Sequence, residues 1–503
     1  MVNANFYSAL AHKAPPANTV LLTDVDGRRY CYGDLEREAA RFASALRALG
    51  LQKGDRVTVQ IEKSVANLWL YLGVLRAGLV FHPLNTAYTP EEVRFFLSDA
   101  EPGLLVCDPS KLSVYEPLCR ELGVGHVLSL DGNGHGSFAD YVADFSEHFV
   151  TEHCDEDELA VLLYSSGTTG RPKGIMLSHR NLRSNAEVLV SSWGFTSQDV
   201  LLHVLPVFHV HGLFVAVHCV LMSGASMHWL PAFDVNNVQA LLPASTVMMG
   251  VPTYYTRLLA EPSFGREDCR NMRVFISGSA PLLPETFAQF RERTGHTILE
   301  RYGLSETGMN CSNPLNGERR AGTVGLPLPG TDIRVCDSEH KPVPSGEIGE
   351  IEVRGSNVFK GYWRMPEKTA SDFTVDGWFI TGDQGRIDTD GYLSIVGRSK
   401  DMVISGGLNV YPKEVETVLN DLPEIKESAV FGVPHPDFGE AVVAVVVMEA
   451  NSTGSAEDIR AKLIGSLASF KLPKRIHVMS ELPRNTMGKV QKNALRTQWS
   501  EPF

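Results

Sequence analysis

The chain has 503 residues, of which 43% are hydrophobic and 21% charged, a balance that is typical of an ordinary globular protein. Its length exceeds what one hydrophobic core usually organises, so we expect two or more domains. The formal net charge of −13 argues against a nucleic-acid-binding protein that relies on a basic face.

The apolar segments and the cysteines bear on the location of the protein. Residues 1–16 contain no apolar run of signal-peptide length, and polar side chains interrupt the most apolar stretch, residues 213–230. We therefore expect a cytoplasmic protein that does not span a membrane. The eight cysteines include no C-x-x-C pair, which fits neither a zinc site nor a disulfide framework and predicts buried free thiols.

Helices and strands alternate through the first part of the chain. The spacing of apolar residues predicts helices over residues 32–49, 64–77 and 89–100. Gly50 is placed to end the first helix in a left-handed cap, and a capping box that begins at Thr89 opens the third. Strand-like runs lie at residues 56–62, 80–84, 103–107 and 159–163. This alternation predicts an α/β fold with mostly parallel sheets that helices cover on both faces.

The pattern changes after residue 330. Short strands broken by Gly and Pro, such as residues 346–353 and 390–395, predict a β-rich subdomain. The last hundred residues return to mixed α/β character, with a helix over 412–419 and a strand over 441–448. We expect a large N-terminal domain, residues 1–398, and a small mobile α+β C-terminal domain, residues 399–503.

A loop rich in glycine and hydroxyl groups follows the strand at 159–163. It runs from Tyr164 to Gly174 and contains one lysine, Lys173. Glycines let backbone N–H groups approach an anion, and the hydroxyls and the lysine add donors and charge, so this composition suits a triphosphate. The loop is not a Walker A motif, because Pro172 precedes Lys173 and Gly174 follows it. Taken alone, the segment is also compatible with a flexible surface loop.

The loop resembles the phosphate-binding motif of the adenylate-forming superfamily, which contains acyl-CoA synthetases, peptide-synthetase adenylation domains and firefly-type luciferases. Five further segments resemble motifs of this superfamily and occur in its order: residues 277–282, 300–306, 381–383, 397–401 and 483–489. The resemblance therefore extends over nearly the whole chain.

The resemblance implies an ATP site with a magnesium ion. Tyr302 would lie against adenine, Asp383 would accept hydrogen bonds from the ribose hydroxyls with help from Arg398, and Thr168 and Glu306 would hold Mg²⁺. The full set of expected ATP-binding residues is Ser165, Ser166, Gly167, Thr168, Thr169, Gly170, Lys173, Gly278, Ser279, Ala280, Glu300, Arg301, Tyr302, Gly303, Leu304, Ser305, Asp383, Arg398 and Lys489.

Lys489 is the expected catalytic residue, together with His209, Thr168 and Glu306. A carboxylate that attacks the α-phosphorus of ATP brings two anions together, and a cation between them stabilises the transition state. In this superfamily the lysine can be acetylated, so an acetyltransferase and a deacetylase are expected partners, and modification would remove the charge. An exposed, solvated lysine is the alternative.

A second half-reaction with coenzyme A requires another arrangement of the active site. The resemblance implies that the C-terminal domain rotates about Lys400 and that Gly406, Gly407 and Leu408 then line the tunnel for the CoA arm.

The acid is indicated by basic residues near the expected acyl pocket. His209, Arg257, Ser279 and Arg301 are the candidate acyl-binding residues, and an arginine fork matches a carboxylate in two hydrogen bonds. This combination resembles malonyl-CoA synthetases, which implies that malonate, ATP and CoA are the substrates and that methylmalonate reacts more slowly. The alternatives are that Arg301 pairs with Glu300 or Glu306, that Arg257 is solvated, and that His209 is a packed wall.

Other functions use the same motifs. We also considered a synthetase for another short or medium-chain acid, a peptide-synthetase adenylation domain, a luciferase-like oxygenase and a non-catalytic nucleotide-binding module. No nucleic-acid partner is expected.

Overall fold

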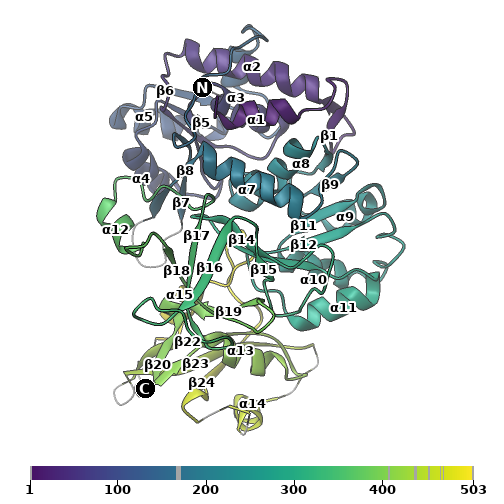
Figure 1. Cartoon of the computed structure of the whole chain (residues 1–503), viewed down its shortest axis with the longest axis vertical. Coiled ribbons are helices and arrows are strands. Elements are labelled where there is room, and N and C mark those ends of the chain that lie inside the picture. Colours follow the sequence, from purple (N-terminus) through teal and green to yellow (C-terminus); the bar gives the residue numbers. More distant parts are fainter. Residues whose placement is uncertain are drawn as a thin grey trace.

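The computed structural model describes residues 3–165, 172–405, 408–435, 439–450, 452, 454–464, 466, 467 and 469–500. Two mixed sheets, a four-stranded antiparallel sheet and a C-terminal five-stranded sheet make up this part of the chain, with helices packed against them (Figure 1). The α/β class predicted from the sequence is therefore confirmed.

The largest sheet has the order β15-β14-β13-β12-β11-β9-β10-β1-β2, and its central strands from β1 to β13 are parallel. Antiparallel pairs close both ends. Its strands are β1 (Val20–Asp24), β2 (Arg29–Cys31), β9 (Val200–His203), β10 (Ser226–Trp229), β11 (Val247–Gly250), β12 (Val274–Ser277), β13 (Leu299–Leu304), β14 (Gly308–Ser312) and β15 (Leu326–Pro327).

The second sheet has the order β6-β5-β3-β4-β7-β8 and is parallel except for its last pair. Its strands are β3 (Arg56–Gln60), β4 (Val80–Pro83), β5 (Leu104–Cys107), β6 (His126–Ser129), β7 (Leu159–Ser165) and β8 (Lys173–Ser178). Most of the inner strand residues are fully buried, as expected for parallel strands that are covered on both faces.

The helices of this part lie beside the two sheets, with α1, α2 and α3 together at one end of the molecule and α10 and α11 next to β11 and β12 (Figure 1). The helical segments are α1 (Phe6–Lys13), α2 (Tyr32–Ala48), α3 (Val65–Arg76), α4 (Pro90–Ala100), η1 (Pro109–Lys111), α5 (Leu112–Leu122), α6 (Ser137–Val142), α7 (His179–Ser192), η2 (His211–Val217), α8 (His218–Ser223), α9 (Val235–Leu241), η3 (Leu242–Ala244), α10 (Pro252–Ala260) and α11 (Pro284–Thr294).

The predicted start and stop signals act as expected. Thr89 accepts a hydrogen bond from the backbone of Glu92, whose carboxylate binds the Thr89 N–H in return, so α4 begins with a capping box. Gly50 follows α2 with φ of +85°, a conformation that glycine adopts without strain. The predicted helices and strands all occur, with ends shifted by a few residues.

The antiparallel sheet lies in the middle of the molecule, and the C-terminal sheet lies at its lower end (Figure 1). The antiparallel sheet contains β16 (Thr331–Cys336), β17 (Gly349–Gly355), β18 (Phe379–Ile387) and β19 (Leu393–Arg398), with α12 (Pro366–Ser371) beside it. The C-terminal sheet contains β20 (Val403–Ser405), β21 (Leu408–Val410), β22 (Ile425–His435), β23 (Gly439–Met448) and β24 (Arg475–Met479). Its helical segments are α13 (Pro412–Asn420), α14 (Ala456–Leu463), η5 (Ser469–Lys471) and α15 (Lys492–Gln498), and η4 (Ser399–Asp401) connects the two sheets.

The predicted domain boundary falls on this connection. β19 ends at Arg398, and the next sheet begins with β20 at Val403. The C-terminal sheet has a hydrophobic cluster of its own, built on residues such as Val442, Val446 and Ile459. A division between residues 398 and 399 remains our proposal.

Two further expectations concern cysteines and membranes. All eight cysteines are free, and seven of them are buried. Among the described residues, no helix has the length and apolar character needed to cross a bilayer.

Asp199 ties together the amino ends of three parallel strands in the largest sheet. Its carboxylate accepts two hydrogen bonds from the Arg273 guanidinium at 2.6 and 2.9 Å and one from the Thr246 hydroxyl at 2.7 Å. The side chain is buried. Burial alone would raise its pKa, but the hydrogen bonds from Arg273, the Thr196 N–H and Thr246 outweigh this effect, so the pKa is lowered.

We expect Asp199→Asn to lower the free energy of unfolding by about 2–4 kcal/mol, because it leaves Arg273 without its counter-charge. The lowered pKa means that the carboxylate stabilises the fold above its unfolded-state pKa and that this contribution is lost as the pH falls through the folded-state pKa. Urea unfolding of both proteins at pH 7 and at about pH 2.5 measures the difference in the free energy of unfolding, which should shrink at the lower pH. An equal difference at both pH values would contradict this account.

Candidate functional site

The expected ribose-binding residues lie together where β13 approaches β18. The Tyr302 hydroxyl donates to the Asp383 carboxylate at 2.5 Å, and Arg398 Nε binds the other carboxylate oxygen at 2.6 Å. Asp383 is held in turn by its backbone N–H, which donates to Thr381 Oγ1 at 3.0 Å. Burial comes first among the causes that raise the pKa of Tyr302, followed by the Asp383 charge, so the phenol stays neutral. The arrangement orients a carboxylate that could accept hydrogen bonds from a cis-diol.

The phosphate loop can be placed only by its two ends. Ser166, Gly167, Thr168, Thr169 and Gly170 lie outside the described residues, as does the side chain of Ser165. Lys173 begins β8, and its ammonium lies 4.4 Å from the centre of the Tyr362 ring and 3.9 Å from Asp372 Oδ2. Burial and the nearby Lys368 lower the pKa of Lys173. A phosphate group would relieve the repulsion between these two cations.

Glu306 follows β13 and faces the same space. Its carboxylate is half-buried, and one oxygen lies 3.5 Å from the Tyr362 hydroxyl. Burial raises its pKa, while the charges of Arg398 and Lys173 lower it. Within the described part of the chain Glu306 forms no ion pair, so a hard oxygen donor is left for a cation that bridges phosphates.

The segment after β12 carries Gly278, Ser279 and Ala280. Ser279 has a φ of +69°, which is strained for a residue with a side chain. This conformation brings its hydroxyl 3.3 Å from Nδ1 of the buried His211. A Cβ at Gly278 would collide with the guanidinium of Arg301, so the glycine leaves room for the arginine and a larger residue would force the guanidinium to move.

Arg301 is the most unusual residue of the site. Its side chain is 3% exposed, and its Nε and Nη2 atoms are buried and have no hydrogen-bond partner among the described residues. Burial lowers its pKa to about 10, and the group therefore stays charged at neutral pH. A buried, charged guanidinium with unused donors is costly unless an anion completes the site.

Glu300 does not pair with Arg301. Adjacent residues of a strand point to opposite faces of the sheet, so β13 separates the two side chains. Glu300 accepts a hydrogen bond from the Leu282 N–H at 3.2 Å, and its second oxygen is buried without a partner. Burial raises its pKa to about 8, which favours the neutral acid at pH 7. The alternative of an Arg301–Glu306 pair also finds no support among the described ion pairs.

His209 and Arg257 lie in different environments. His209 is half-buried, its Nδ1 accepts a hydrogen bond from the His211 N–H at 3.3 Å, and burial and then Arg301 and Lys489 lower its pKa to about 4. It is therefore a neutral imidazole between two cations. Arg257 is exposed in the last turn of α10. Among the described residues, no hydrogen bond or ion pair joins it to the other acyl-binding candidates, so its role remains a prediction.

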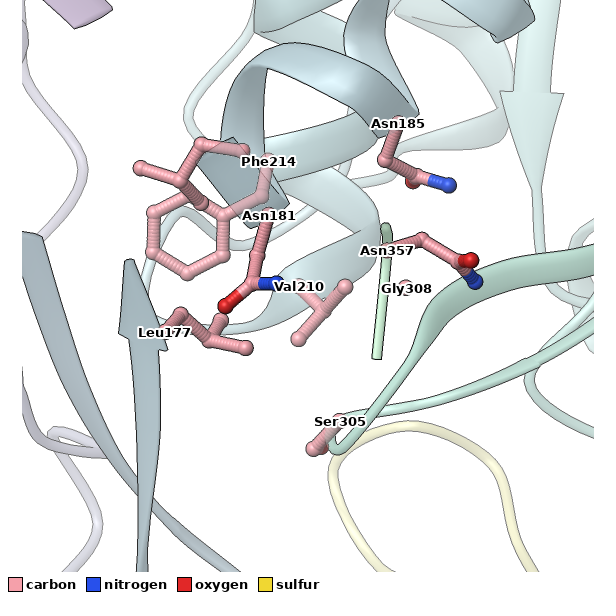
Figure 2. A pocket seen from close by; sticks show the side chains of 9 residues that line it. Leu177, Asn181, Asn185, Val210, Phe214, Ser305, Gly308 and Asn357 are labelled. Carbon is pink, nitrogen blue, oxygen red and sulfur yellow. The ribbon is translucent and has the colours of Figure 1, made fainter. Parts of the chain in front are cut away.

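Gly303, Leu304 and Ser305 form the end of β13 and the turn into β14. A Cβ at Gly303 would collide with the backbone of Gly308, and Leu304 packs against the hydrophobic core. Behind Ser305 lies a small cavity whose walls come from α7, η2 and this turn (Figure 2). It is lined by Leu177, Asn181, Leu182, Asn185, Val210, Phe214, Ser305, Gly308 and Asn357.

Lys489 sits on a turn that rests on the N-terminal part of the chain. Gly488 has a φ of +73°, and a Cβ there would lie 3.1 Å from Thr253 Oγ1. The neighbouring Thr486 hydroxyl accepts a hydrogen bond from Asn85 at 3.3 Å. The Lys489 side chain is exposed, yet its pKa is lowered by the loss of water around the ammonium and by the Arg398 charge. The lysine therefore lies within the field of the nucleotide-binding residues.

The expected hinge is anchored on both sides. Ser399 donates to Glu350 at 2.7 Å, while the Asp401 carboxylate binds Arg496 of α15 at 2.7 Å. Lys400 lies between them and is exposed, and burial of its ammonium and the Arg398 charge lower its pKa to about 8. Of the expected CoA-tunnel residues, Gly406 and Gly407 and the side chain of Leu408 lie outside the described residues.

Several residues of the site carried no signal in the sequence. His211, Asn85 and Thr253 belong to no motif that we recognised, and their contacts join segments far apart in the chain. Tyr362 and Asp372 flank Lys173 in the same way.

Comparisons with known proteins identify the family of the chain. A family model described as AMP-binding enzyme matches residues 9–363, and one described as AMP-binding enzyme C-terminal domain matches residues 414–489. The malonate–CoA ligase of Arabidopsis thaliana is 33% identical over 518 residues, which cover 94% of this chain and 85% of that protein.

The fold is also similar to solved structures. The crystal structure of ATP-bound MatB from Rhodopseudomonas palustris has a TM-score of 0.98 at 51% identity, with 99% of both chains covered. The apo crystal structure of MatB from the same organism has a TM-score of 0.86 at the same identity and coverage. The arrangement of the present chain is thus more similar to the ATP-bound structure. From the family match over residues 9–363 and from these relatives, the chain belongs to the AMP-binding enzyme family.

Proposed function

We propose that the protein is an ATP-dependent malonate–CoA ligase. It forms malonyl-CoA from malonate and CoA through a malonyl-AMP intermediate and releases AMP and pyrophosphate. The observation that carries this proposal is Arg301, a buried guanidinium that lies against Gly278 and near His209 and keeps two donors without a partner among the described residues. The relatives named malonate–CoA ligase and the family match support the same reaction.

In the first half-reaction one carboxylate of malonate attacks the α-phosphorus of ATP, and pyrophosphate leaves. Asp383 and Arg398 hold the ribose, and Tyr302 packs against the adenine. Lys489 stabilises the charge that develops between the carboxylate and the phosphate. Lys173 and the phosphate loop bind the leaving pyrophosphate.

A magnesium ion fits the residues that are present. Glu306 provides an unpaired carboxylate next to Lys173, and Thr168 of the phosphate loop would supply a second oxygen. When bound, the ion neutralises phosphate charge during displacement.

In the second half-reaction the thiol of CoA attacks the acyl carbon of malonyl-AMP, and AMP leaves. Lys489 occupies the side of the site that the thiol needs, so the C-terminal domain rotates about Lys400 between the two steps. Gly406, Gly407 and Leu408 then line the path of the CoA arm. The anchors on Ser399 and Asp401 are compatible with a pivot at Lys400.

The selectivity of the acyl pocket follows from its charge. Arg301 binds the second carboxylate of malonate, and His209 limits the space beside it. Sites built around a polar group reject analogues that lack it by about 10⁴–10⁵, so acetate is a very poor substrate, whereas the extra methyl group of methylmalonate costs about 10–200-fold. Ligases for other short or medium-chain acids and luciferase-like oxygenases are not favoured, because neither needs a buried cation in the acyl pocket.

The cytoplasmic location and the acetylation of Lys489 by an acetyltransferase, reversed by a deacetylase, also remain predictions. Acetylation would abolish the first half-reaction because it removes the charge of Lys489.

The direct test of the function is a substrate panel. Purified protein is incubated with ATP, Mg²⁺, CoA and either malonate, methylmalonate, propionate or acetate, and AMP release is followed. We expect malonate to give the highest kcat/KM, methylmalonate a lower one and acetate almost none. Acetate activated as well as malonate would refute the proposal.

Arg301→Met should lower kcat/KM for malonate by about 10²–10⁴-fold, since two charge-assisted hydrogen bonds are lost. The KM for ATP should change little, because the ribose-binding residues are intact. The matched control is Arg354→Met, which removes an exposed arginine of β17 that pairs with Asp332 of β16. This variant should behave as the unmodified protein. An Arg301→Met enzyme with unchanged malonate kinetics would leave the acyl site unassigned.

Lys489→Ala should lower the rate of malonate-dependent ATP–pyrophosphate exchange by about 10²–10⁴-fold. Formation of malonyl-CoA from supplied malonyl-AMP should be preserved, because that step does not use the lysine. As the pH rises, Lys489 loses its charge at a lower pH than an ordinary lysine does, because its pKa is lowered. The exchange rate of the unmodified enzyme should therefore begin to fall at that lower pH. Lys462→Ala removes another lysine of the C-terminal sheet region, paired with Glu424, and should not affect either step. Normal exchange in Lys489→Ala would rule out the assigned role.

A further inference from the structure

A second buried cation lies behind the acyl site. Lys63 follows β3 and is 8% exposed, and within the described residues it forms no ion pair. Its Nζ lies 2.5 Å from the Leu230 carbonyl oxygen, 2.9 Å from the His203 carbonyl oxygen and 2.7 Å from His203 Nδ1. The ring of Trp229 lies 4.3 Å away. The contacts of the ammonium described here are thus to two carbonyl oxygens, one imidazole nitrogen and one aromatic face.

The hydrogen bonds fix the charge of the Lys63–His203 pair. The two carbonyl oxygens each need a hydrogen from Nζ, and His203 Nε2 must carry a hydrogen because it lies 2.9 Å from the Gly212 carbonyl oxygen. The 2.7 Å contact between Nζ and Nδ1 needs one more, since two lone pairs would otherwise face each other. These four hydrogens correspond to a charged lysine with a neutral imidazole, or to a neutral amine with an imidazolium. Either way the pair carries one positive charge.

The Lys63–His203 pair keeps its positive charge although burial disfavours it. Burial lowers the pKa of Lys63 and of His203 well below their ordinary values. Two carbonyl dipoles and the Trp229 ring oppose this effect on the pair. A buried charge kept without a carboxylate is costly for folding, so a benefit elsewhere is expected.

The pair is directly connected to the acyl-binding turn. His203 Nε2 donates to the carbonyl of Gly212, which follows His211. His211 contacts Ser279, and burial and then the charge of Arg301 lower its pKa. A continuous row of basic groups therefore leads from Lys63 to Arg301, and the described residues add no carboxylate that binds either end of it.

We propose that Lys63 is a specificity-determining residue: with His203 it holds one positive charge behind the turn of His209 and His211, and this charge favours a dicarboxylate over a monocarboxylate. The inference rests on the proposed function, because it assigns Lys63 to the recognition of malonate. Malonate brings an additional negative charge into the pocket, and a fixed buried cation attracts it without reorganisation. A monocarboxylate has only its reacting carboxylate, so it gains only the electrostatic attraction between that group and the buried cation.

The test separates charge from packing. Lys63→Gln keeps a hydrogen-bond donor but removes the charge, Lys63→Met removes both, and Lys63→Arg keeps the charge. Lys53→Met, which breaks a surface ion pair with Glu158, is the matched control. For each protein kcat/KM is measured with malonate and with propionate, and folding is followed by thermal unfolding. We expect the malonate-to-propionate ratio to fall about tenfold or more in Lys63→Gln and Lys63→Met and to be largely retained in Lys63→Arg and Lys53→Met.

Each outcome is informative. A Lys63→Gln enzyme whose two activities fall equally would show that the residue only supports the fold, and the proposal would be wrong. The same conclusion would follow if Lys63→Gln fails to fold while Lys63→Arg folds. If Lys63→Met alone fails to fold, the comparison of Lys63→Gln with Lys63→Arg decides. An unmodified enzyme that does not prefer malonate would instead contradict the proposed function, before any variant is compared.

Discussion

The site depends on a positive charge that is buried and has no counter-ion in the part of the chain that the structure describes. The Arg301 guanidinium has lost nearly all contact with water, and two of its nitrogens have no partner. An isolated charge in this position opposes folding unless its surroundings accept it. The neighbouring histidines are held neutral, and Glu300 projects to the other face of β13. The protein therefore keeps the charge available for a ligand instead of neutralising it internally.

Much of the fold could be predicted because its signals are local. The capping box at Thr89 and the glycine after α2 mark helix ends through contacts within four residues. The parallel sheets could be predicted because each short apolar strand and each helix is recognised from its own local pattern. Their alternation along the chain then indicates parallel sheets. The motif at residues 300–306 located Tyr302 and Arg301, but not the separation of Arg301 from Glu300, which follows from the strand geometry of β13.

The remaining features depend on residues that are distant in sequence. Lys63 meets His203 across 140 positions, and Asn85 meets Thr486 across 401. A buried lysine in such a place has no local signature, because its acceptors are backbone carbonyls that every residue has. The phosphate loop differs from Lys63, because it was recognised from its sequence. Its sequence was informative, whereas its residues from 166 to 171 lie outside the described structure.

Gly278 adds a constraint on how the acid preference of this scaffold can change. Any side chain at that position would overlap the arginine at 301, and a smaller residue at 301 would leave an empty space bordered by a bare glycine. A substitution at position 278 or at position 301 alone should therefore disturb the packing of the pocket until the other position also changes. The two positions should evolve as a coupled pair, and a search for variants that accept apolar acids is better served by combinatorial libraries at both codons than by sequential rounds at either one.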